Sequence, residues 1–211
     1  MNVPAKIPKW VQLLGFGLTF RIPTDRQEVF LTFDDGPIPA LTPWLLDELA
    51  KHDAKATFFL VGENAEKHPE LIKRILAEGH RIGNHTFNHL NGFKTPVLQY
   101  VTNAEKCQKT LLPYLKENES LLFRPPYGRL TPGQMIKLKK RGYKIILWDV
   151  LSKDYDSKTS AEQCTRNVLD NVVPGSIIVM HDNLKATQNL QAALPAILSG
   201  LKAKGFGFSV L

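Results

Sequence analysis

Apolar runs of strand length alternate with helical patterns along most of the chain, and this alternation limits the fold more than any other feature. We expect strands near residues 29–33, 56–61, 80–84, 121–124, 143–148, 176–180 and 206–210. Between them, apolar residues recur at helical spacing near 42–49, 65–78, 97–112, 131–142, 160–171 and 190–201. Strands that are apolar on both faces need helices on both sides, so the pattern predicts an α/β fold with a mostly parallel sheet. Periodicity alone is compatible with an open doubly wound sheet and with a small, incomplete barrel.

The length of the chain, 211 residues, fits one domain with a substantial core. No repeat, low-complexity tract or long polar linker marks an internal boundary. We expect residues 29–211 to form this domain and residues 1–28 to be a lead-in that packs on it. Apolar stretches are too short to span a bilayer, so we expect no transmembrane segment. Nothing in the sequence predicts an oligomeric state.

The N-terminal residues resemble a weak signal peptide. Gln12 interrupts their apolar run, and Arg21 follows it without a small-residue cleavage site. Cys107 and Cys164 are too few for a disulfide framework, and we expect both to be buried, unreactive thiols in helices. These features favour a soluble, bacterial-type protein of the cytoplasm.

A formal net charge of +7 and a pI of about 9.4 raise the question of nucleic-acid binding. The basic residues are scattered, and no basic stripe interleaved with aromatic residues is present to stack bases. We therefore expect a solvated basic surface and no nucleic-acid partner.

Reactive side chains follow the expected strands at the same end of each. In a parallel α/β architecture the carboxyl ends of the strands meet at one face, where such folds carry their active sites. The residues at these ends are Asp34 and Asp35, His85 and His89, Arg124, the segment 149–154, and His181. Their common position predicts a site.

Two pairs of these residues suggest a metal centre. Asp34 and Asp35 are neighbours on an extended chain, so their carboxylates point apart, and one can bind a metal while the other faces substrate. His85 and His89 are four residues apart, a spacing that brings both imidazoles to one side of a helical turn. A His-His-Asp set with open positions is typical of a catalytic metal site. We treat His52, His68 and His80, which lack such partners, as surface or core residues.

Two further strand ends supply charge. Arg124 begins a rigid Arg-Pro-Pro-Tyr-Gly turn and can orient a carboxylate such as Asp34, and the turn can aim an N–H at an oxyanion. His181 ends a buried strand facing the other strand ends, which favours a general acid.

These residues together resemble the polysaccharide deacetylase family, also called carbohydrate esterase family four. The likeness runs from about Val29 to the C-terminus and rests on five motifs in order. They are Thr32-Phe33-Asp34-Asp35-Gly36-Pro37, His85-Thr86-x-x-His89, Arg124-Pro125-Pro126-Tyr127, the segment from Trp148 to Tyr155, and Val179-Met180-His181. Members of the family have a distorted (β/α) barrel of seven strands, so the resemblance implies a barrel here.

The resemblance also implies a role for each matched residue. Asp34 would be the general base, and Asp35, His85 and His89 would bind one divalent metal. The remaining expectations are that Arg124 holds Asp34, that the Tyr127 backbone N–H binds the oxyanion, that Asp154 tethers the general acid His181, and that Pro126, Trp148 and Tyr155 line the substrate groove. Zinc suits this ligand set best, and cobalt or nickel can substitute.

Three positions depart from the family pattern. Tyr155 stands where a tryptophan is common, Leu151 where an aspartate often lies, and Val179 where leucine is usual. Tyr155 and Leu151 change the groove wall and therefore affect the preference for polymers more than the chemistry.

The implied activity is hydrolysis of N-acetyl groups from N-acetylated sugars, such as those of chitooligosaccharides or peptidoglycan. One alternative is hydrolysis of another non-peptide amide, such as a cyclic ureide or a small N-acyl metabolite, on the same fold. The other is a catalytically silent carbohydrate-binding protein.

Overall fold

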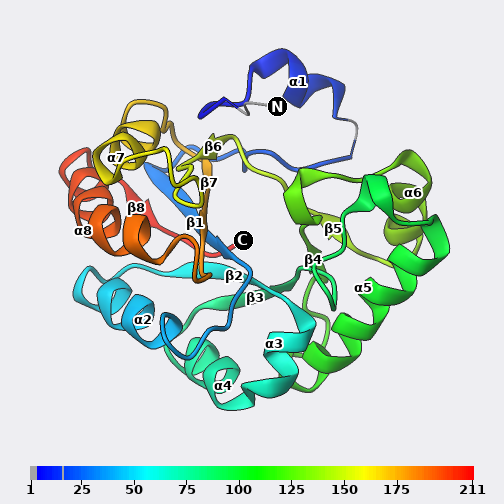
Figure 1. Ribbon diagram of the computed structural model, residues 1–211. Helices are drawn as coiled ribbons and strands as arrows, with labels where there is room; N and C mark the ends of the chain where they lie inside the picture. Colours follow the sequence, from blue (N-terminus) through cyan, green and yellow to red (C-terminus); the bar gives the residue numbers. More distant parts are fainter. Residues whose placement is uncertain (1–3, 16) are drawn as a thin grey trace.

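Parallel strands form one curled sheet, and helices cover its outer face (Figure 1). This computed structural model describes residues 4–15 and 17–211. The strands are β1 (Glu28–Asp34), β2 (Ala56–Leu60), β3 (Arg81–Asn84), β4 (Leu122–Phe123), β5 (Lys144–Ile145), β6 (Val150–Leu151), β7 (Ile177–His181) and β8 (Gly207–Phe208). The helices are α1 (Lys9–Leu14), α2 (Thr42–Lys51), α3 (Gly62–Lys67), α4 (Pro69–Ala77), α5 (Val97–Leu111), α6 (Pro132–Lys140), α7 (Ala161–Leu169) and α8 (Thr187–Ala203).

The strand order confirms the expected single-domain distorted (β/α) barrel with about seven parallel strands. Seven strands follow the order β5-β4-β3-β2-β1-β7-β6, and β8 pairs with the start of β1. Every pairing between these strands is parallel. β1 lies at the centre of the sheet, and its residues from Val29 to Asp34 are buried. The apolar faces of α2, α4, α7 and α8 pack against this part of the sheet and form the main core.

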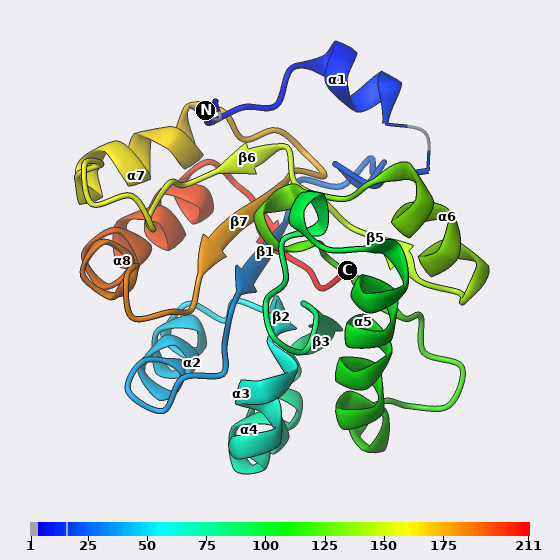
Figure 2. The same ribbon diagram turned by 45° about the vertical axis from the view of Figure 1, so that its right-hand side comes forward.

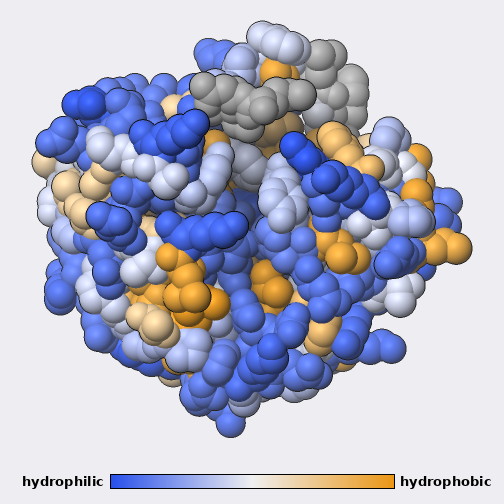
Figure 3. Space-filling model, viewed as in Figure 1, coloured by the Kyte–Doolittle hydropathy of each residue, from blue (hydrophilic) through white to orange (hydrophobic). Residues whose placement is uncertain are grey.

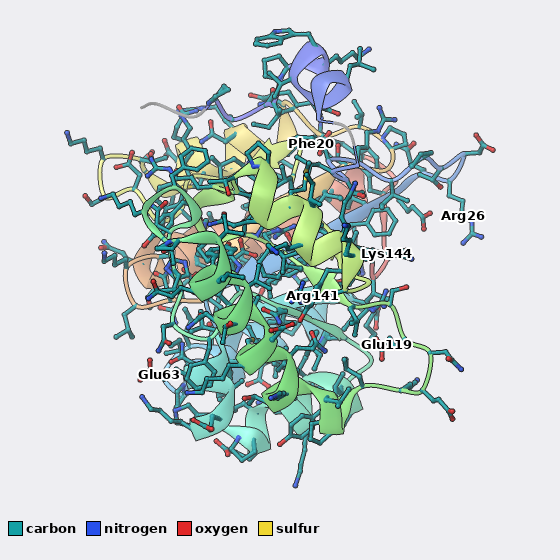
Figure 4. All side chains as sticks on the ribbon, turned by 90° about the vertical axis from the view of Figure 1, so that its right-hand side faces the viewer. Phe20, Arg26, Glu63, Glu119, Arg141 and Lys144 are labelled. Carbon is teal, nitrogen blue, oxygen red and sulfur yellow. The ribbon has the colours of Figure 1, made fainter. Side chains whose placement is uncertain are left out.

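All strands point the same way, so their carboxyl ends lie on one face. Figure 2 shows the arrowheads of β1 and β7 directed toward the side that faces the viewer in Figure 1. Figure 4 shows the same polarity in side chains. Glu63, which follows β2, lies on the opposite side from Arg26, Glu119 and Lys144, which lie at or before the starts of β1, β4 and β5.

The structure differs from the sequence-based expectations in two elements. The expected helix over 65–78 is two helices, because Pro69 interrupts the pattern: α3 ends at Lys67 and α4 begins with Pro69 as its first residue. The expected strand over 143–148 is reduced to β5, and the two-residue strand β6 was not expected. Both edge strands are too short for a periodic pattern to reveal them.

The ring of strands is incomplete between β5 and β6, and the N-terminal segment fills the opening (Figure 1). We call residues 4–15 and 17–22 the N-terminal strap. Thr19 forms a parallel bridge with Ile146 beyond β5, and Lys6 forms an antiparallel bridge with Val150 of β6. The Lys6 ammonium is 2.7 Å from the Asp149 carboxylate, which is 1% exposed. The strap therefore supplies backbone partners to both free edges and a cation to a buried acid.

Candidate metal and catalytic site

Asp34 and Asp35 lie at a sharp turn at the end of β1. Asp35 has a φ of 85°, and the next peptide bond, Gly36–Pro37, is cis. A Cβ on Gly36 would lie 2.3 Å from the Asp182 carboxylate, so only glycine fits at this position. The turn sends the two consecutive carboxylates in different directions, and they have different partners.

Asp34 is paired with a buried arginine. Arg124 Nη1 donates to Asp34 Oδ1 at 2.7 Å and to Thr32 Oγ1 at 2.6 Å. Arg124 Nη2 donates to the Leu147 carbonyl at 3.0 Å, and the guanidinium carbon lies 4.1 Å from the centre of the Phe59 ring. Arg124 is completely buried and Asp34 is 3% exposed. These contacts fix Asp34 in one orientation and compensate its charge.

His85 and His89 come from the loop after β3. A helical turn was expected here, but the loop is not helical, because Thr86 and His89 have φ values of 64° and 53°. Asn84 Oδ1 accepts the Thr86 N–H, and Thr86 Oγ1 accepts the Leu90 N–H, so side chains stabilise the turn. The two imidazoles nevertheless meet, with ring centres 5.1 Å apart.

Asp35, His85 and His89 converge on one point. Their ligand atoms all lie within 4.8 Å of one another. Asp35 Oδ1 is 3.0 Å from His89 Nε2 and 3.4 Å from His85 Nε2, and this buried oxygen accepts no hydrogen bond from the described residues. Two atoms that share a tetrahedral zinc ion at about 2.0–2.1 Å lie about 3.4 Å apart. The buried oxygen without a donor and the two nitrogens therefore fit a metal ion.

Groups behind these side chains hold them in orientations that suit metal binding. His85 Nδ1 is 2.8 Å from the Arg124 carbonyl oxygen, so this nitrogen carries the proton and Nε2 keeps a free lone pair. Asn183 Nδ2 donates to Asp35 Oδ2 at 2.5 Å, and Asn64 Nδ2 donates to the Asp35 carbonyl at 2.9 Å. Burial opposes the charge of Asp35, yet the rings of His85 and His89 hold the pKa of its carboxyl well below its ordinary value.

His181 lies across from Asp34, because the two residues are register partners at the ends of β7 and β1. Asp154 Oδ1 accepts a hydrogen bond from His181 Nδ1 at 2.8 Å, and Asp154 Oδ2 accepts the His181 backbone N–H at 2.7 Å. Burial alone would lower the pKa of His181, but the buried Asp154 carboxylate raises it to about 9. The imidazole is therefore protonated at neutral pH in the metal-free protein, with Nε2 directed away from Asp154.

These groups open into one cavity of about 670 Å³. Asp34, Asp35, His85, His89 and His181 line it, together with the expected groove residues Trp148 and Tyr155. Tyr127, whose backbone N–H was expected to bind the oxyanion, lines it as well. Arg124 and Asp154 lie behind the lining, and Pro126 is buried and does not line the cavity. The histidines set aside in the sequence analysis, His52, His68 and His80, do not line it either.

Of the three residues that depart from the family pattern, Leu151 and Tyr155 line the cavity and Val179 does not. Leu151 lines the cavity and pairs in register with Val179 on β7. The Tyr155 ring packs edge-on against His181, with ring centres 4.8 Å apart.

Tyr127 has a φ of 60°, which directs its backbone away from a helical path, and its N–H donates to no backbone carbonyl of the described residues.

Sequence reasoning missed several residues of the cavity. Asn64 and Asn183 hold Asp35, and Arg129 and Lys185 line the mouth. Asn183 lies two residues beyond His181, so the polar run after β7 was a usable signal. Asn64, Arg129 and Lys185 lie in segments without a distinctive pattern.

Comparison with known proteins agrees with the geometry. A sequence model of the polysaccharide deacetylase family matches residues 21–146. The chain belongs to the polysaccharide deacetylase family. The resemblance read from the five motifs is therefore confirmed.

The similarity to individual members extends over nearly the whole chain. The chain is 40% identical over 203 residues to a peptidoglycan-N-acetylglucosamine deacetylase of Bacillus cereus, and the alignment covers 96% of this chain and 72% of that protein. It is 31% identical to a chitooligosaccharide deacetylase of Azorhizobium caulinodans, covering 92% and 98%. A crystal structure of a peptidoglycan N-acetylglucosamine deacetylase superposes with a TM-score of 0.86 at 39% identity, covering 96% of this chain and 94% of that one.

Proposed function

We propose that this protein is a divalent-metal-dependent hydrolase that removes N-acetyl groups from N-acetylated glycans. One observation carries the proposal: the convergence of Asp35, His85 and His89 beside two independent charge pairs, Asp34 with Arg124 and Asp154 with His181. A metal site, a fixed base and a protonated acid are the three parts that amide hydrolysis needs. Family membership and the named activities of the relatives support the same conclusion.

Asp35, His85 and His89 would hold the ion, with zinc favoured by the mixed nitrogen and oxygen ligands and cobalt or nickel able to replace it. A divalent ion held by these residues would lower the pKa of bound water from 15.7 to about 7 and would polarise a carbonyl oxygen.

Two side chains would carry out the two proton transfers, Asp34 as the acceptor and His181 as the donor. Asp34, held by Arg124, takes the proton of the attacking water, and the Tyr127 N–H donates to the oxyanion that forms on the acetamide oxygen. An amine leaves poorly unless it is protonated, and His181 is placed across from Asp34 to give it a proton. Asp154 orients the imidazole and stabilises its cationic form.

The substrate follows from the relatives. Those compared above are named for peptidoglycan N-acetylglucosamine and for chitooligosaccharides. N-Acetylglucosamine is the unit common to both, and we propose it as the sugar that loses its acetyl group. Tyr127, Trp148 and Tyr155 would form the aromatic wall against which that sugar packs.

One assay tests this proposal. Metal-stripped protein, with and without added zinc or cobalt, is incubated with N-acetylglucosamine oligomers, cyclic ureides and small N-acyl amines, and free amine and acetate are measured. We expect metal-dependent acetate release from the oligomers. Hydrolysis only of ureides or small amides would establish that alternative, and binding of oligomers without any release would establish a silent carbohydrate-binding protein.

Cellular location is a further part of the proposal. No helix of the described residues is long and apolar enough to cross a membrane. The cytoplasmic location expected from the sequence is tested by fractionating cells that produce the protein. Recovery from the cell wall would instead fit action on peptidoglycan in place.

A further inference from the structure

Two cationic side chains at the mouth of the cavity have no part in the proposed chemistry. Arg129 directly follows the Pro126–Gly128 turn after β4, and Lys185 lies in the turn between β7 and α8. Both line the cavity. They come from opposite halves of the curled sheet, because β3, β2 and β1 lie between β4 and β7. Figure 3 looks onto this face, which is hollowed near its centre, with both hydrophilic side chains and hydrophobic patches around the hollow.

Neither cation has an acidic partner in the part of the chain that the structure describes. No ion pair formed by residues 4–15 and 17–211 includes Arg129 or Lys185. Two acids of the described residues line the cavity, and one of them, Asp34, is already paired with Arg124. Asp35 remains, and a divalent ion would more than balance it. The mouth therefore carries an excess of positive charge toward whatever enters.

Arg129 also lies near two aromatic rings. Its guanidinium carbon is 6.0 Å from the ring centres of both Phe93 and Tyr127, and its backbone N–H donates to the Pro126 carbonyl at 3.1 Å. Phe93 and Tyr127 are 65% and 59% exposed, respectively. A guanidinium near exposed aromatic rings is favoured in that position by cation–π attraction.

We propose that Arg129 and Lys185 select glycans that carry carboxylates next to the N-acetylated sugar. This inference rests on the proposed deacetylase function, and it names the substrate class within it. An acetamido sugar at the metal site is neutral and offers no partner to these cations. Because the cations lie on both sides of the cavity, they would contact the sugars on either side of it in the glycan chain. Chitooligosaccharides have no carboxylates, whereas the lactyl ethers and peptides of peptidoglycan do. The mouth therefore favours the acidic glycan over the neutral one.

The test compares two forms of one molecule. A soluble peptidoglycan glycan fragment is used with its carboxylates free, and again after they have been capped as methylamides. For zinc-loaded wild-type protein, kcat/KM and KM are measured by acetate release. The affinity of the metal-free protein for each form is measured by calorimetry. The same measurements are made on the Arg129→Gln/Lys185→Gln double variant and on Lys73→Gln, a control that removes an exposed cation from α4.

We expect the wild-type protein to prefer the free-carboxylate form by about three- to tenfold in affinity, since exposed ionic contacts are individually weak. The preference should fall toward one in about 1 M salt, where the Debye length is about 3 Å. The double variant should treat the two forms alike, because the free-carboxylate form loses its advantage in KM and in affinity. Lys73→Gln should keep it.

A wild-type protein that treats both forms alike, or a double variant that keeps the full preference, overturns the inference. If neither form is deacetylated, the proposed function fails, and the calorimetric ratio still decides whether the two cations recognise carboxylates.

Discussion

Asp34 and Asp35 are consecutive residues, yet their environments assign them different chemistry. Asp34 faces the buried Arg124, which fixes its orientation, whereas Asp35 faces two imidazoles and keeps a buried oxygen without a hydrogen-bond donor. The turn at Gly36 makes this separation possible. The proposed base and one proposed metal ligand thus lie side by side in a two-residue segment.

Replacing Asp34 with asparagine separates these roles. An asparagine side chain can still accept the Arg124 hydrogen bond, but it cannot take a proton from water. We expect deacetylation by Asp34→Asn to fall by about 10²–10⁴-fold, the usual contribution of a general base. Metal content by atomic absorption and the melting temperature should stay near wild type. Asp53→Asn, at an exposed acid, is the control, and substantial remaining activity in Asp34→Asn would remove Asp34 from the role of base.

The His181–Asp154 pair gives a prediction about pH. The pKa of His181, raised by Asp154 to about 9, exceeds the 6.5 of an unfolded histidine. The folded metal-free protein therefore binds more protons between these values, and the stabilisation is complete below pH 6.5 and lost as pH rises through about 9. Proton NMR of the metal-free protein should show a His181 midpoint near 9, shifted downward in Asp154→Asn. Urea unfolding should show a loss of stability over this range that is smaller in His181→Gln, and a midpoint near 6.5 would contradict the pairing.

The reactive side chains could be predicted from the sequence, but the residues that hold them in position could not. Asp35, His85 and His89 could be predicted because they directly follow strands of one polarity. The helical turn assumed for the two histidines was wrong, since left-handed residues in a loop bring them together instead. Asn64 was not predictable, because an asparagine in the first turn of a helix is common and its contact depends on three-dimensional packing.

Among the secondary-structure elements, the long buried strands and the amphipathic helices were predictable, and the barrel edges were not. β1, β2 and β7 are apolar along their length, whereas β5 and β6 have two residues each and are defined by their neighbours. The missing contacts at these edges come from the N-terminal strap. No local pattern in residues 4–22 indicates partners so distant in the sequence.

The strap should contribute to stability through Lys6. Its ammonium is the only cation paired with the buried Asp149 among the described residues, and Lys6→Met would leave that carboxylate without a counter-charge. We expect the free energy of unfolding to fall by about 1–3 kcal/mol in a urea titration. Lys9→Met, at an exposed position of α1, should change it by less than about 0.5 kcal/mol.

The double variant Lys6→Met/Asp149→Asn removes both charges and should recover part of the loss. If Lys6→Met is as stable as wild type, the ion pair does not secure the strap.

For the molecule as a whole, the site should link metal binding to stability. Its ligands come from the ends of β1 and β3, so an ion bound by all three can bind only the folded chain. A ligand at 100 times its Kd stabilises the folded state by about 2.7 kcal/mol. Adding zinc to stripped protein should therefore raise Tm by several degrees in a calorimetric scan. His85→Ala should show little or no rise, and an equal rise in that variant would place zinc elsewhere.

The opening between β5 and β6, which the N-terminal strap fills, affects the order in which the chain folds during synthesis. Lys6 and Asp149 are 143 residues apart in sequence. At a translation rate of about 5–20 residues per second, the ribosome releases the first of these residues roughly 7–30 s before the second. The N-terminal strap must therefore wait, unpaired, until β6 has been made, and it docks only after the other strands of the ring up to β6 have been synthesised.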